Sequence, residues 1–166
     1  HEFDKLIEIL QKSEHINFIG LHFHVGSQIT RVEEVFGLEC RRVNEIVRYF
    51  EGKGLKVNNI NLGGGLGVDY DDPDGSAIAD FGTWFSTIAA NIERRPDQAV
   101  HVEPGRSLVA QCATLISRVV FVKSGETKNF LIMDAGMNDL IRPALYGAYH
   151  KIENLSASQR QFFPTF

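Results

Sequence analysis

The feature of this sequence that most constrains its fold is a cluster of glycines, Gly63, Gly64, Gly65 and Gly67, directly after the strand candidate 57–62, whose apolar residues are Val57, Ile60 and Leu62. Glycine reaches positive φ and lets backbone N–H groups approach an anion closely. A glycine run also forms ordinary turns. The spacing matches neither the dinucleotide motif G-x-G-x-x-G nor the P-loop. The cluster alone therefore leaves two interpretations open, a phosphate cradle and a flexible turn.

Around this cluster, apolar residues alternate between helical and strand spacing. The pattern predicts helices over about 3–13, 31–52 and 76–93, and strands over 16–25, 57–62 and 99–102. The expected buried stripe of the third helix is Ile78, Phe81, Phe85, Ile88 and Ile92. Helices that alternate with strands are typical of βα units around a parallel sheet, which binds ligands at the carboxyl ends of its strands.

The pattern of apolar and polar residues changes after Arg106. Residues 108–122 and 130–133 have strand-like composition, and a polar turn separates them. We therefore predict two domains, a partial barrel over residues 1–106 and the start of a largely β domain over residues 107–166.

Polar residues follow each of the three predicted strands, in the loops 24–27, 63–65 and 103–106. If the strands are neighbours, these loops converge and suit a planar, phosphorylated, nitrogen-containing ring. The hydroxyl of Ser27, glycine amides and Arg106 would hold the phosphate, and His24 would stack on the ring. Glu103 would keep the ring nitrogen protonated, which makes pyridoxal phosphate a strong electron sink.

The same residues also allow simpler interpretations, in which they have structural roles rather than bind a cofactor. Ser27 suits the N-cap of the following helix, and Glu103 and Arg106 suit an ion pair across a Pro-Gly turn. His22 is a candidate for a purely structural strand residue. His22 and His24 share one strand face, but no ligand set for a metal is spaced nearby.

The charge and cysteine content of the sequence limit the kinds of molecule that this protein is expected to bind. The formal net charge is −4, from 17 Lys and Arg against 21 Asp and Glu, without a basic block, which argues against nucleic acid or an anionic membrane as partner. Two distant cysteines, Cys40 and Cys112, suggest a reducing compartment. No signal peptide or membrane-spanning run is present, so we expect a cytoplasmic protein with a small-molecule partner.

Four stretches in this order carry a resemblance to a known family: GLHFHVGSQ from Gly20, NLGGGLG from Asn61, VEPGRS from Val102 and MDAGMNDLIRPALY from Met133. Together they resemble the pyridoxal-phosphate-dependent decarboxylases of the alanine-racemase-like fold. The fourth stretch is similar to diaminopimelate decarboxylases rather than to ornithine or arginine decarboxylases. The resemblance covers almost the whole chain.

The resemblance implies a role for each matching residue. His24 and Glu103 would be catalytic, His24 on the cofactor ring and Glu103 at its nitrogen, and Arg106, Arg142 and Tyr146 would bind the substrate. The full cofactor-binding set would be His24, Ser27, Gly63, Gly64, Gly65, Glu103, Pro104, Gly105 and Arg106. No metal site is implied.

The resemblance also implies an activity and an architecture. The parent protein would be a homodimeric lyase of lysine biosynthesis that converts meso-2,6-diaminopimelate to L-lysine and carbon dioxide. Alternatives are a sibling decarboxylase acting on arginine, ornithine or carboxynorspermidine, and a noncatalytic homologue that binds a partner. The fold would be α/β, the C-terminal half of a TIM-type (β/α)8 barrel followed by the start of a β domain. No lysine here matches the one that holds the cofactor, so we expect the fragment to be inactive. A closed barrel needs about eight strands and this chain supplies about three, so we also expect an open sheet and self-association.

Overall fold

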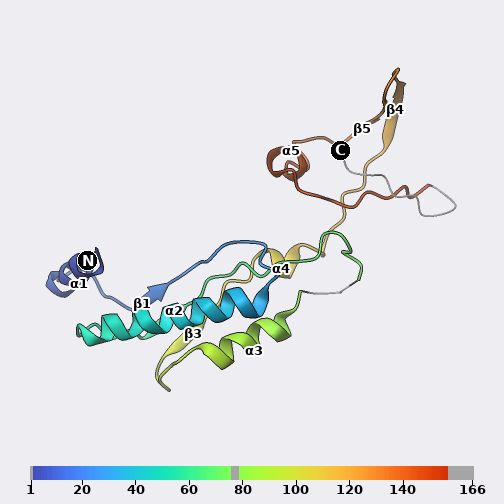
Figure 1. The fold of residues 1–166 in the computed structure, drawn as a ribbon. Helices are drawn as coiled ribbons and strands as arrows, with labels where there is room; N and C mark the ends of the chain where they lie inside the picture. Colours follow the sequence, from blue (N-terminus) through green and yellow to red (C-terminus); the bar gives the residue numbers. More distant parts are fainter. Residues whose placement is uncertain (1, 76–78, 157–166) are drawn as a thin grey trace. The chain divides into compact units, whose positions relative to one another are not determined.

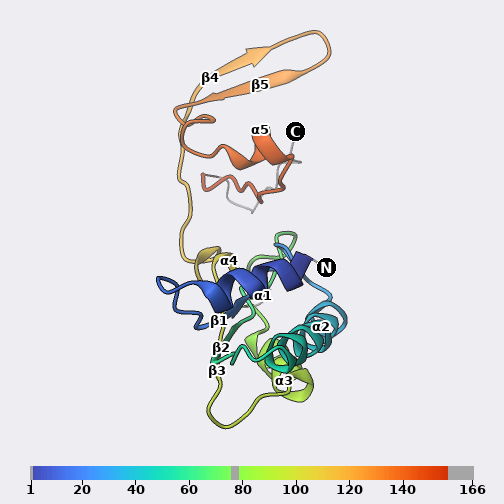
Figure 2. The same cartoon turned by 90° about the vertical axis from the view of Figure 1, so that its left-hand side faces the viewer.

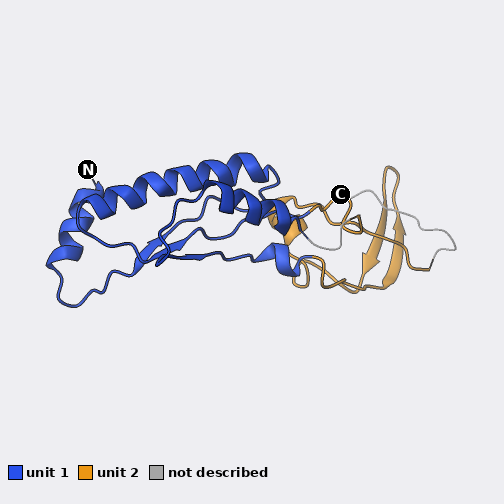
Figure 3. Ribbon diagram, turned by 90° about the horizontal axis from the view of Figure 1, so that it is seen from below, with its two compact units in different colours: residues 1–68, 78–110 blue, residues 69–77, 111–166 orange. Residues whose placement is uncertain are grey.

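The computed structural model describes residues 2–75 and 79–156, and its chain forms two compact units (Figure 3). Unit 1 comprises residues 1–68 and 78–110, and unit 2 comprises residues 69–77 and 111–166. The domain boundary after residue 106 stays a prediction about the parent protein. No helix within the described ranges is both long and apolar enough to cross a membrane.

Unit 1 is built on a three-stranded parallel sheet with strand order β1-β2-β3. Figures 1 and 2 show the two connecting helices, α2 and α3, side by side along one face of this sheet. The elements are α1 (Glu2–Lys12), β1 (Gly20–His22), α2 (Val32–Gly52), β2 (Asn59–Asn61), α3 (Phe81–Asn91), β3 (Ala99–His101) and α4 (Arg106–Val109). The predicted βα alternation is confirmed, and the sheet of the described residues is open.

The register of the sheet sorts its side chains into two faces. Leu21, Ile60 and Val100 lie in one row across the three strands, and Ile60 is fully buried. The next row along the strands is polar and consists of His22, Asn61 and His101. Because successive strand residues point to opposite faces, the polar row lies on the face away from the apolar row.

The core of unit 1 lies between α2 and α3 and the apolar face of the sheet. Trp84 on α3 is fully buried, and its ring centroid lies 5.5 Å from that of Phe36 on α2. A hydrogen bond also joins α2 to α3, because Asn44 donates through Nδ2 to the Asn91 carbonyl at 2.8 Å. The buried apolar stripe of α2 consists of Phe36, Cys40, Val43, Val47 and Phe50.

The third helix begins later than the sequence pattern predicts. Asp80 is its N-cap, and its side chain accepts a hydrogen bond from the Thr83 N–H at 2.9 Å. Residues 76–78, including the stripe residue Ile78, lie outside the described residues. Phe85, another expected stripe residue, is 49% exposed, because Trp84 and Ile88 occupy the buried face of the helix.

Unit 2 contains an antiparallel pair, β4 (Val119–Ser124) and β5 (Asn129–Met133), and a short helix, α5 (Arg142–Tyr146). The predicted strand over 130–133 is confirmed. The strand expected over 108–122 is wrong for residues 108–118, because residues 106–109 form α4 and the strand starts only at Val119. Large apolar side chains of β4 and β5 are exposed, among them Phe121 and Phe130.

Candidate active site

The three polar loops of unit 1 meet beyond the carboxyl ends of β1, β2 and β3. The Phe23 N–H donates to the Asn61 carbonyl at 2.8 Å, which joins the first loop to the second. The Glu103 N–H donates to the Gly63 carbonyl at 2.6 Å, which joins the third loop to the second. The glycine loop is therefore the central one of the three, and the convergence that the sequence suggested is observed.

The glycine loop is packed tightly between its two neighbours. A Cβ added at Gly64 would lie 2.0 Å from the Glu103 carbonyl oxygen, and one at Gly65 would lie 2.2 Å from the Gly26 carbonyl oxygen. Gly63 and Gly65 also have φ of +66° and +104°, which side chains rarely adopt. These glycines are required by the close approach of neighbouring backbone, a reason that the sequence alone did not reveal.

The loop amides have different partners. The Gly63 N–H donates to Asn61 Oδ1 at 2.8 Å, and the Gly64 N–H donates to His24 Nδ1 at 3.3 Å. The Gly65 N–H makes no hydrogen bond within residues 2–75 and 79–156. Of these three amides, that of Gly65 is the one open to an external acceptor.

His24 and Ser27 lie on the first loop and are both exposed. The bond from the Gly64 N–H makes Nδ1 of His24 an acceptor and thereby orients the imidazole ring. The Ser27 hydroxyl has no hydrogen bond to the described part of the protein, and the N-cap of α2 is Arg31. Ser27 is therefore not the helix cap, which was its simpler interpretation.

Glu103 and Arg106 lie on the third loop and point to different partners. Glu103 Oε1 accepts a hydrogen bond from Asn61 Nδ2 at 2.7 Å and lies 3.7 Å from His22 Nε2. Arg106 is half-buried and donates through NH1 to Gln28 Oε1 at 3.1 Å. The Glu103 carboxylate thus pairs with residues of the sheet face rather than with Arg106.

Two residues of this site were not singled out from the sequence. Gln28 joins three segments, because its side-chain amide donates to the Val68 carbonyl and accepts from Arg106. Asn61 joins Glu103 to the glycine loop. Both lie inside stretches that carried the family resemblance, and the available signal was a polar side chain at the end of β2 for Asn61 and in the loop after β1 for Gln28.

Arg142 and Tyr146, the predicted substrate residues, both belong to α5 of unit 2. The Arg142 guanidinium lies 5.4 Å from the ring centroid of Tyr70 and 5.9 Å from that of Tyr146. Its buried Nε atom has no hydrogen-bond partner in the described chain. Burial and the nearby Arg142 charge lower the pKa of His150, whose ring packs edge-on against Tyr70 at 5.6 Å. Arg142 is therefore held among aromatic rings.

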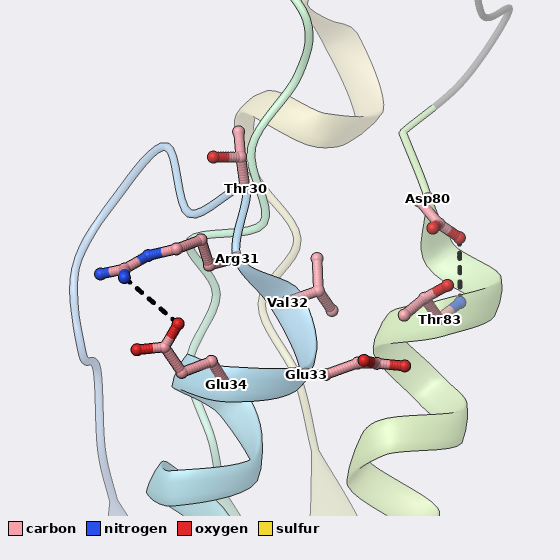
Figure 4. A pocket seen from close by; sticks show the side chains of 7 residues that line it. All are labelled: Thr30, Arg31, Val32, Glu33, Glu34, Asp80 and Thr83. Atoms are coloured by element: carbon pink, nitrogen blue, oxygen red, sulfur yellow. Dashed lines mark hydrogen bonds and ion pairs between the residues drawn. The ribbon is translucent and has the colours of Figure 1, made fainter.

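A separate hollow of about 360 Å³ lies at the N-terminal ends of α2 and α3 (Figure 4). It is lined by Thr30, Arg31, Val32, Glu33, Glu34, Asp80 and Thr83. Arg31 pairs with Glu34 at 3.2 Å, and Asp80 is occupied as a helix cap. None of the predicted site residues lines this hollow, so we assign the candidate site to the loop junction instead.

The donor set at the loop junction fits a phosphorylated pyridine. The Ser27 hydroxyl, the Gly65 amide and the Arg106 guanidinium are donors suited to a phosphate. The hydroxyl of Ser107, at 5% exposure, is buried without a hydrogen-bond partner in the described residues. The Glu103 carboxylate is an acceptor of the kind that suits a protonated ring nitrogen. No cluster of three or more metal-binding side chains occurs in residues 2–75 and 79–156.

Comparison with known proteins identifies relatives over most of the chain. Residues 2–110 match the family described as pyridoxal-dependent decarboxylase, pyridoxal binding domain. A diaminopimelate decarboxylase from Bacteroides thetaiotaomicron is 47% identical over 158 residues, which cover 95% of this chain and 41% of that protein. The chain thus spans less than half the length of this relative.

Solved structures give a consistent result. The crystal structure of diaminopimelate decarboxylase from M. jannaschii in complex with L-lysine matches with a TM-score of 0.74 and 34% identity, over 89% of this chain and 34% of that one. The enzyme from Helicobacter pylori, also complexed with L-lysine, matches with a TM-score of 0.76 and 30% identity, over 93% of this chain and 39% of that one.

Proposed function

This chain belongs to the pyridoxal-dependent decarboxylases, and from that premise we propose that the full-length protein converts meso-diaminopimelate to L-lysine and carbon dioxide. Relatives named diaminopimelate decarboxylase support this substrate, as do similar structures that hold L-lysine. Membership of the family confirms two predictions from the sequence, pyridoxal phosphate as the cofactor and part of a TIM-type barrel as the fold.

The observation that carries the proposal is the junction of the loops that contain His24, Gly64 and Glu103. Pyridoxal phosphate, when bound, supplies an electron sink for the negative charge that develops as carbon dioxide leaves. Glu103 would hold a proton on the pyridine nitrogen, because an adjacent carboxylate favours the positively charged form. The His24 ring, oriented through Nδ1, would stack on the face of the pyridine.

The phosphate end would be held by hydrogen-bond donors from all three loops. Ser27 and the Gly65 N–H are open to an acceptor, and Arg106 contributes a positive charge that Gln28 orients. Gly63 and Gly64 would shape the same cradle through the backbone, and residues 104–105 would form its second wall. Charge-assisted donors of this kind bind phosphate strongly and set the orientation of the ring.

The substrate carboxylates would be recognised by Arg106, Arg142 and Tyr146. Diaminopimelate carries a second amino-acid end, which arginine binds with paired N–H donors. Selection for that end would separate diaminopimelate from ornithine and arginine, which lack a second carboxylate. The contact of Arg142 with Tyr70 and Tyr146 supports a guanidinium held ready in one orientation.

Release of carbon dioxide from purified full-length protein tests the substrate. With pyridoxal phosphate present, we expect kcat/KM for meso-diaminopimelate to exceed that for arginine, ornithine or carboxynorspermidine by at least about 100-fold. A substrate without the second carboxylate would leave the charge of a buried arginine unpaired, and such a loss provides discrimination of this size. Equal or greater turnover of one of the other substrates would replace the proposed function by that of a sibling enzyme. No turnover of any of them would favour a noncatalytic homologue.

The role of Glu103 has its own test. In full-length Glu103→Gln, a neutral amide replaces the charge beside the pyridine nitrogen, so we expect kcat to fall by about 100-fold or more. Retention of pyridoxal phosphate should change less than kcat. Unchanged turnover would exclude the electronic role of Glu103.

We further propose that the full-length protein is a cytoplasmic homodimer. The exposed apolar side chains of β4 and β5 support burial against further protein surface, and the free thiols of Cys40 and Cys112 suit a reducing compartment. Light scattering should give twice the monomer mass, and cell fractionation should place the protein in the cytoplasm. A monomer at assay concentrations would refute the dimer.

A further inference from the structure

Asn61, the last residue of β2, makes two side-chain hydrogen bonds that join two parts of the candidate site. Its Nδ2 donates to Glu103 Oε1 at 2.7 Å, and its Oδ1 accepts from the Gly63 N–H at 2.8 Å. The chemistry fixes the amide orientation, because a backbone N–H only donates and a carboxylate only accepts. One side chain therefore ties the acid to the glycine loop.

Within the described residues, the polar contacts of the Glu103 carboxylate are all made by one of its two oxygens. Asn61 Nδ2 bonds to Oε1, and His22 Nε2 lies 3.7 Å from the same atom. Glu103 Oε2 makes no hydrogen bond within the described part of the chain. The side chain of Glu103 is exposed, so without these contacts its carboxylate would be free to rotate.

We propose that Asn61 is a positioning residue that orients Glu103 so that Oε2 is presented to the pyridine nitrogen. This inference rests on the proposed function, because it assumes that Glu103 contacts that nitrogen. Asn61 does not touch the cofactor or the substrate in this assignment. It acts through Glu103, and it sets the position of the acid relative to the glycine loop.

The two bonds of Asn61 are separable by substitution. In Asn61→Ser, the shorter hydroxyl can still accept from the Gly63 N–H two residues on, as serine does in local turns, but it does not reach Glu103. Asn59 provides a matched control on the same strand face. Its side chain also makes two bonds, to the Ile19 carbonyl and to His101, and neither involves Glu103.

The direct readout is the affinity of full-length protein for pyridoxal phosphate relative to its analogue with carbon in place of the ring nitrogen. A hydrogen bond to the charged nitrogen predicts a preference for pyridoxal phosphate of about 10- to 100-fold in the unsubstituted protein. We expect Asn61→Ser to reduce this preference by about fivefold or more. Asn59→Ser should leave the preference unchanged.

A double-mutant cycle on kcat provides a second readout. If Asn61 acts through Glu103, Asn61→Ser should lower kcat in the unsubstituted protein but lower it little further in Glu103→Gln. Additive losses, or an unchanged cofactor preference in Asn61→Ser, would overturn the inference while Glu103→Gln still supports the proposed function. If Glu103→Gln itself changes neither readout, the proposed function of Glu103 fails and the inference fails with it. Asn61→Thr makes the same comparison if Asn61→Ser is not recovered folded.

Discussion

Replacing Gly64 by alanine tests whether contact between the loops builds the site. An alanine Cβ would lie 2.0 Å from the Glu103 carbonyl oxygen, whereas non-bonded Cβ contacts essentially never fall below 3.0 Å. One loop must therefore move by about 1 Å, and a misplacement of that size costs about 100-fold in rate. The neighbour is backbone, so no side-chain rotation relieves the contact.

We expect full-length Gly64→Ala to lose about 100-fold in kcat and about 1–3 kcal/mol in the free energy of unfolding, the usual cost of overpacking. Carbon dioxide release at saturating pyridoxal phosphate measures the first quantity, and urea denaturation measures the second. Gly52→Ala is the matched control, because a Cβ at Gly52 meets no atom within 4 Å and this residue ends α2, outside the motifs of the site.

Together, kcat and the free energy of unfolding distinguish a role of the Gly64 contact in the geometry of the site from a role in folding alone. If Gly64→Ala matches Gly52→Ala in both kcat and stability, the close packing of the glycine loop against Glu103 is refuted. If stability falls while kcat stays within about twofold, the contact supports folding but does not set the geometry of the site.

Two further predictions concern Glu39 and Tyr70. Burial raises the pKa of Glu39 from 4.5 to about 7, and both carboxylate oxygens lack a partner in the described chain. The neutral form is therefore favoured in the folded protein, so stability should fall by about 3 kcal/mol as pH rises from 4.5 to 7. This fall should be absent in Glu39→Gln and unchanged in the exposed control Glu45→Gln, as measured by urea denaturation at several pH values; equal slopes in both variants would contradict it. Tyr70→Ala removes the aromatic ring that stacks against the Arg142 guanidinium. In a steady-state assay it should raise KM for diaminopimelate about 5- to 30-fold, which is the loss of a partly desolvated cation–π contact. Tyr70→Phe keeps the ring, so its KM should stay within about twofold of the unsubstituted value. Equal KM values for the two Tyr70 variants would show that stacking is not what holds Arg142.

Local sequence pattern predicted the elements of unit 1 well. Apolar spacing placed α1 and α2 close to their observed limits, and short apolar runs placed all three parallel strands. Periodicity succeeds here because each element buries one face, and that requirement is written into consecutive residues. It failed where capping and tertiary contacts decide, as at the start of α3 behind Asp80 and in α4 after Gly105.

The candidate site was predictable as a set of residues but not as a network. His24, Glu103 and the glycines stood out because each follows a strand, where parallel sheets hold their ligands. The partners of these residues did not stand out. Asn61 and Gln28 act through contacts across 42 and 78 residues of sequence, and no local pattern encodes such distances.

Sequence by itself determined the alternation of α1 to α3 with β1 to β3, the motifs at the strand ends and the family, because these depend on residue type and local spacing. Tertiary structure alone decided why Gly64 has to be glycine, which amides of the loop are occupied and which oxygen of Glu103 is held by Asn61. The physical reason is that a Cβ clash and a hydrogen bond both depend on the distance between atoms of different loops, and the pairing of the parallel strands sets that distance.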